Sequence, residues 1–107
     1  MRVLLDEQLD WRLRRSFGEG FEVKTVAGRG WKGKKNGELL ALMEEAGFEA
    51  LITVDRGIPR QQNLSQRAVA VVSLAARKTR LADTAPIVED GLERLRSAPP
   101  GKATRLP

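Results

Sequence analysis

Short apolar runs divide the chain and predict its strands. Residues 2–5 (RVLL), 49–54 (EALITV) and 68–75 (AVAVVSLA) are almost continuously apolar, which is typical of strands buried on both faces. Residues 21–26 (FEVKTV) alternate between apolar and polar positions, which predicts a strand with one less buried side. Residues 102–106 are expected to add a strand at an edge of the sheet.

The segments between these runs carry apolar residues at helical spacing. Leu9, Leu13 and Phe17 recur at four-residue steps and predict one helical face. Residues 38–48 predict a second helix, and residues 77–98 begin basic and become helical.

Strands that alternate with helices, and that are themselves nearly all apolar, predict a parallel sheet covered on both faces. We therefore expect an α/β fold with three layers, α/β/α, and a mostly parallel sheet of four to five strands. The 107 residues suit a single domain, since no repeat, linker or low-complexity segment divides them. The crossover connections are expected to be right-handed.

The composition excludes several kinds of chemistry. The chain has no histidine and no cysteine, which excludes disulfides, thiolate or imidazole metal ligands and Ser-His-Asp catalysis. Charges interrupt every apolar run, so we expect no membrane span and a cytoplasmic protein. The net charge of +5 favours a polyanionic partner, either nucleic acid or an acidic protein.

Two aspartates directly follow predicted buried strands. Asp6 follows residues 2–5, and Asp55 follows residues 49–54. Because ligands of open α/β sheets bind beyond the carboxyl ends of the strands, we expect both carboxylates at one rim, holding Mg²⁺ or Mn²⁺. Glu38 opens a helix expected to begin on that rim and is the third catalytic candidate. The alternative is that each aspartate only caps the turn or helix after it.

Basic and amide residues near the expected rim are candidates for binding nucleic acid. Residues 27–37 contain four glycines and four basic residues around Trp31, whose indole could stack on a base. The predicted contacts are Trp31, Lys32, Lys34, Lys35, Arg56 and Arg60. Asn36 is a candidate helix N-cap, and Asn63 could orient a nucleotide or close its own loop. A solvated basic surface is the alternative for each cluster.

The segments "MRVLLDEQL", "KNGELLALMEEAGFEALITVDRG" and "QQNL" resemble the PIN-like domains of a family related to the Mut7-C domain and to VapC-type toxin ribonucleases. The resemblance spans roughly residues 2–95. Asp6 matches the aspartate after the family's first strand, and Thr53 and Asp55 match its T-x-D motif. The resemblance implies a PIN-like fold and an Mg²⁺- or Mn²⁺-dependent ribonuclease. It also implies an RNA substrate and an antitoxin protein as partner, and it leaves a homodimer open.

The chain departs from the resemblance in its set of acids. Many relatives carry an aspartate where this chain has Asn36, and Gln61, Gln62 and Asn63 stand where a further acid would be expected. A second interpretation is therefore a catalytically weakened PIN-like module that binds RNA or a partner protein without cleavage. A response-regulator-like domain, which also gathers carboxylates at strand ends, is a third and less supported interpretation.

Overall fold

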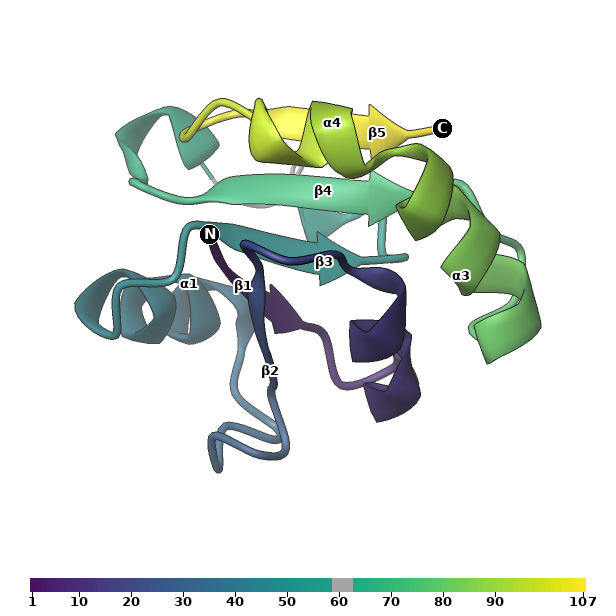
Figure 1. The fold of residues 1–107 in the computed structure, drawn as a ribbon. Coiled ribbons are helices and arrows are strands. Elements are labelled where there is room, and N and C mark those ends of the chain that lie inside the picture. Colours follow the sequence, from purple (N-terminus) through teal and green to yellow (C-terminus); the bar gives the residue numbers. More distant parts are fainter. Residues whose placement is uncertain (59–62) are drawn as a thin grey trace.

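The structure is a computed structural model that describes residues 1–58 and 63–107. In these residues, five strands form one sheet in which every neighbouring pair is parallel, in the order β2-β1-β3-β4-β5 (Figure 1). The strands are β1 (Arg2–Leu5), β2 (Glu22–Thr25), β3 (Ala50–Thr53), β4 (Ala70–Leu74) and β5 (Ala103–Leu106). The expected α/β fold with a parallel sheet is confirmed, including the edge strand near the end of the chain.

Helices cover both faces of the sheet and make the three layers. The described helices are η1 (Trp11–Ser16) and η2 (Leu64–Gln66), both 3₁₀ helices, and α1 (Asn36–Glu45), α3 (Leu81–Asp90) and α4 (Leu92–Arg96). Successive side chains of a strand point to opposite faces, so β1 contributes to both cores. Val3 and Leu5 pack with η1, α3 and α4, whereas Leu4 packs with α1 and η2.

The apolar pattern located the strands better than the helices. Leu9, Leu13 and Phe17 are buried together as expected, but only residues 11–16 are helical, and they form a 3₁₀ helix. Asp10 sets its start by accepting a hydrogen bond from the Arg12 backbone N–H, and Phe17 is already extended. Side-chain spacing therefore identified the buried face, while the capping residues set the helix length.

The connections between strands do not all have the same hand. The β1–β2 connection, through η1, and the β4–β5 connection, through α3 and α4, cross the same face in opposite directions along the sheet, so their hands are opposite. The β2–β3 connection returns across the other face and shares its hand with the first. The expectation of uniformly right-handed crossovers is therefore wrong for the β4–β5 connection. Contacts between α3 and η1 hold this connection on the η1 face.

Gly91 separates α3 from α4 at the point where the helices meet the last strand. A Cβ at this position would lie 2.8 Å from Leu106 Cδ1 and 3.0 Å from the Ile87 carbonyl oxygen. Leu106 is buried, so it has little room to move away. The predicted helix over residues 77–98 is therefore divided in two where β5 approaches closely.

We expect Gly91→Ala to lower the free energy of unfolding by about 1–3 kcal/mol, because the added methyl group overpacks this contact. Gly18→Ala is the matched control, since a Cβ there meets Leu92 Cδ1 at an ordinary 3.8 Å. Urea denaturation of both variants measures the effect. Equal stability of the two variants would contradict the close approach of β5.

Candidate metal and nucleic-acid site

Asp6 and Asp55 follow neighbouring strands at the carboxyl edge of the sheet. β1 and β3 pair directly, and the Asp6 backbone N–H extends the ladder by donating to the Ile52 carbonyl at 2.9 Å. From β1 the chain moves to β2 on one side and then returns to β3 on the other, so the strand order reverses between β1 and β3. The crevice beyond the carboxyl ends at such a reversal is where open α/β sheets bind ligands.

The hydroxyl of Thr53, the last residue of β3, connects the two aspartates. Its Oγ1 donates to Asp6 Oδ2 at 2.7 Å and accepts from the Asp55 backbone N–H at 3.0 Å. Thr53 is fully buried, so few other partners can replace these two. The resemblance matched Thr53 to a motif but assigned it no role. In the structure, Thr53 positions both strand ends.

The aspartates also organise the turns that follow them. Asp6 Oδ1 accepts from the Glu7 N–H at 2.9 Å, and Asp55 Oδ1 accepts from the Gly57 N–H at 2.7 Å. Among the described residues, Asp55 Oδ2 has no hydrogen-bond partner. Because each carboxylate oxygen has two lone pairs, a capping role leaves acceptor capacity for a ligand. Capping and cation binding are therefore compatible here.

Two carboxylates on paired strands fit a small hard cation, which commonly binds one or two protein carboxylates and completes its shell with water. Within residues 1–58 and 63–107, no group of three or more Asp, Glu, His or Cys side chains is arranged to hold a metal ion. The donor set is thus limited, in the described chain, to a two-carboxylate site.

Glu38 is not brought to this rim. α1 lies beside the amino ends of the strands (Figure 1), and Arg67, which precedes β4, reaches both the Gly37 carbonyl at 3.4 Å and Glu44 at 2.7 Å. The reason lies in the preceding loop, where Trp31 packs edge-to-face on Phe48, just before β3, with ring centroids 5.9 Å apart. The chain therefore runs toward the amino ends of the strands before α1 begins.

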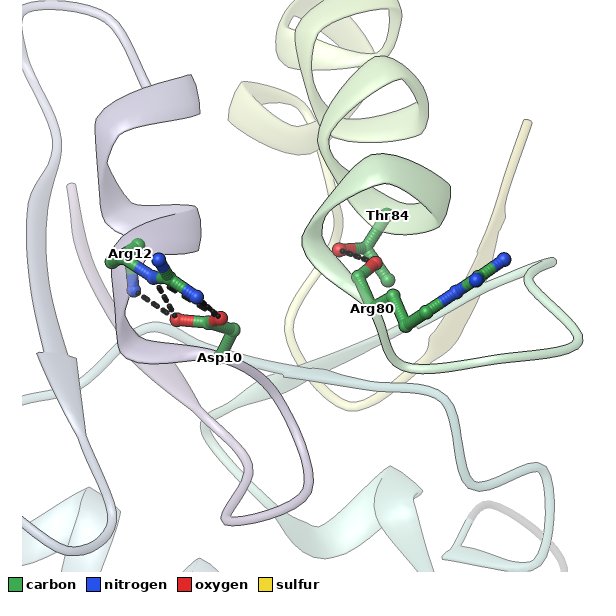
Figure 2. Close-up of polar contacts among 4 residues, drawn as sticks. All are labelled: Asp10, Arg12, Arg80 and Thr84. Atoms are coloured by element: carbon green, nitrogen blue, oxygen red, sulfur yellow. Dashed lines mark hydrogen bonds and ion pairs between the residues drawn. The ribbon is translucent and has the colours of Figure 1, made fainter.

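Asp6 also lines a groove of about 650 Å³ at the carboxyl edge. The walls come from residues 6–12, the end of β2 and residues 79–80 before α3. Figure 2 shows Asp10 and Arg12 on the η1 side and Arg80, whose carbonyl accepts from the Thr84 hydroxyl, on the α3 side. Asp6 thus stands in an open groove that a ligand can enter.

Asp10 and Arg12 form a paired charge in this groove. The Arg12 side chain donates to Asp10 Oδ2 from Nη2 at 2.7 Å and to Oδ1 from Nε at 3.1 Å. These bonds, together with the Arg12 backbone N–H, lower the pKa of Asp10 to about 2. Asp10 is therefore ionised and paired with Arg12, whereas Asp6 and Glu7, which also line the groove, form no ion pair with the described residues.

The predicted nucleic-acid contacts are dispersed. Trp31 is partly buried, and the Arg29 guanidinium lies over its ring at 4.8 Å. Asn63 accepts a hydrogen bond from the Ser65 hydroxyl at 2.6 Å and so closes its own loop. Asn36 is the first residue of α1, following Lys35 at the N-cap position. Lys32, Lys34, Lys35 and Arg56 are exposed, and Arg60 lies outside the described residues.

Comparison of the chain with protein-family models, with curated proteins and with solved structures found no match. Among the described residues, no helix has the length and apolar character needed to cross a membrane. The fold and the side chains at the carboxyl edge are therefore the features that indicate a function.

Thr53→Val is expected to lower the free energy of unfolding by about 1–3 kcal/mol, because it leaves the Asp55 N–H without its buried acceptor. Thr84→Val is the control: Thr84 is equally buried, but the Arg80 carbonyl that accepts its hydroxyl also accepts the Thr84 backbone N–H. Urea denaturation should show the larger loss for Thr53→Val. A larger loss for Thr84→Val would argue against the role given to Thr53.

Arg12→Gln is expected to raise the pKa of Asp10 from about 2 toward its ordinary value of 3.8. A lowered pKa in the folded state means that the pair stabilises the protein above about pH 3.8 and that this contribution is lost as the pH falls toward 2. Carboxyl titration by NMR measures the shift. Arg77→Gln removes the same charge from another exposed site and should leave the titration of Asp10 unchanged; an unchanged titration in Arg12→Gln would refute the pairing.

Proposed function

We propose that this protein is a ribonuclease of PIN-like type that depends on Mg²⁺ or Mn²⁺ and acts at the carboxyl edge between β1 and β3. The observation that carries the proposal is the placement of Asp6 and Asp55 on paired strands, joined through the buried hydroxyl of Thr53. The reversal of strand order at the same point supports a ligand there rather than elsewhere on the sheet.

In this proposal, Asp6 and Asp55 hold the cation through carboxylate oxygens. A bound divalent cation supplies Lewis acidity to a phosphodiester and lowers the pKa of a water molecule. Thr53 keeps the Asp6 carboxylate in one orientation by donating to Oδ2. Arg56, exposed beside Asp55, offers a planar set of donors that suits the non-bridging oxygens of a phosphate. The net charge of +5 draws a polyanion toward the protein.

The proposal extends to a biological role through the resemblance to VapC-type toxins. The protein would be the toxin of a toxin–antitoxin pair, and an antitoxin protein would neutralise it. An acidic antitoxin segment would be attracted to the same basic surface as RNA.

A second candidate function is an RNA-binding PIN-like module that does not cleave. The observation that favours it is that, among the described residues, no three Asp, Glu, His or Cys side chains are grouped so that they could hold a metal ion. Such a module would bind RNA through its basic residues, with an affinity that falls as salt rises. Its binding would survive the removal of either carboxylate.

The deciding experiment incubates mixed RNA and Mn²⁺ or Mg²⁺ with the protein and with Asp6→Asn and Asp55→Asn. We expect each substitution to lower the cleavage rate by more than about 100-fold, since a metal contributes several kcal/mol of transition-state stabilisation. Asp90→Asn, which neutralises an exposed acid at the end of α3, is the matched control and should cleave normally.

Two outcomes separate the candidates. Cleavage that disappears with EDTA and in both site variants supports the ribonuclease. Salt-dependent RNA binding without cleavage by a correctly folded protein, retained in both variants, refutes the ribonuclease and supports the non-cleaving module.

A further inference from the structure

Trp11 offers an aromatic surface beside the candidate metal site. It is the first residue of η1 and is 50% exposed, and no other large hydrophobic residue among those described is exposed. Trp11 lines the same groove as Asp6. Trp31, by contrast, is partly buried and packs edge-to-face on Phe48. A nucleobase can therefore reach the indole of Trp11 more readily than that of Trp31.

Two arginines accompany the exposed indole. The guanidinium carbon of Arg14 lies 4.9 Å from the centre of the Trp11 ring, and that of Arg15 lies at 5.5 Å. With both arginines in place, the Trp11 residue as a whole is still 50% exposed. An indole beside guanidinium groups combines a stacking surface with cations for the adjoining phosphates, which is how proteins bind single strands.

A second hollow of about 340 Å³ adjoins the groove. Arg14, Lys24 and Arg29 line it, and its described lining contains no acid. Thr25, at the end of β2, lines both the groove and the hollow, so the two are neighbours. Arg14 belongs to the hollow and also lies over Trp11, which connects the cationic hollow to the aromatic surface.

The residues that line the groove and those that line the hollow differ in charge. Asp6 and Glu7 contribute negative charge to the groove, and a bound cation would compensate them. Asp10, which also lines the groove, is already paired with Arg12. The other charged residues that line these two sites are cationic: Arg12 and Arg80 in the groove, and Arg14, Lys24 and Arg29 in the hollow. The surface thus combines two acids that a bound cation would compensate, an exposed aromatic residue in the same groove, and an adjoining basic hollow.

We propose that the groove and the hollow form one track for single-stranded RNA. A base stacks on Trp11 next to Asp6, and the following phosphates lie against Arg14, Lys24 and Arg29. The inference rests on the proposed RNA substrate but not on cleavage, because stacking and phosphate contacts require no chemistry at Asp6.

Binding is measured by fluorescence anisotropy with a labelled single strand of about 12 nucleotides, in EDTA so that no cleavage occurs. Trp11→Ala should weaken binding about 5- to 150-fold, the range expected for one base stacked on an aromatic ring. Trp11→Phe keeps a stacking ring and should recover most of the loss. Trp31→Phe is the matched control; it keeps an aromatic ring against Phe48 and should bind as the unaltered protein does.

The phosphate contacts are tested by salt dependence. Arg14→Gln with Lys24→Gln should reduce the slope of log affinity against log salt by about 1.4, or about 0.7 for each phosphate contact to a single strand. Arg94→Gln with Lys102→Gln removes the same charge from α4 and from the start of β5, at the opposite edge of the sheet, and should leave the slope nearly unchanged. A duplex of the same sequence should bind more weakly than the single strand, since its bases remain stacked.

The outcomes for the track and for the nuclease are distinguishable. If the unaltered protein binds RNA in EDTA and Trp11→Ala weakens that binding, but the unaltered protein does not cleave RNA with metal, the ribonuclease proposal fails and the track stands. If the protein cleaves RNA but Trp11→Ala and the paired Arg14 and Lys24 variant bind as the unaltered protein does, the track is refuted. Binding of an acidic protein, but of no RNA, at this surface would also overturn it.

Discussion

The buried hydroxyl of Thr53 is the interaction on which the geometry of the carboxyl edge depends. A hydroxyl has a single proton, so donating it to Asp6 leaves only acceptor capacity for the Asp55 N–H. Displacing either strand end would leave a buried polar group without its partner, at a cost of about 1–3 kcal/mol. The ends of β1 and β3 are therefore held together where the strand order reverses, and both aspartates take fixed positions at that point.

The fold was largely predictable because the strands are buried on both faces. Burial of this kind requires runs of apolar residues, and such runs are visible in the sequence without knowledge of any partner. The same reasoning placed Asp6 and Asp55 at one edge. It did not place Glu38, because the position of α1 depends on Trp31 packing against Phe48, a contact between residues far apart in the chain. Local spacing holds no information about such contacts, nor about the hand of the β4–β5 connection.

The two tryptophans show how composition can mislead and spacing can inform. Trp31 stands among glycines and lysines, which favoured a role as an exposed stacking surface, yet it is partly buried and packs on Phe48. Trp11 falls outside the four-residue line of Leu9, Leu13 and Phe17 that faces the core. Its exposure fits that spacing, because a short helix that buries one face turns its other residues toward solvent. The spacing alone allowed Trp11 either to widen the buried face or to lie at its edge, and the structure shows that it is exposed.

A cation bound to the aspartates would decide how far along the basic surface the phosphates of an RNA strand can extend. Without a cation, Asp6 and Glu7 repel a phosphate, while Arg14, Lys24 and Arg29 attract one, so the phosphates of an RNA strand would lie in the basic hollow rather than beside the aspartates. A divalent cation on the carboxylates reverses the sign of that end and extends the favourable path to Asp6. Binding at the hollow and chemistry at the carboxylates are therefore separable by metal alone. The same residues can serve a non-cleaving module without metal and a ribonuclease with it.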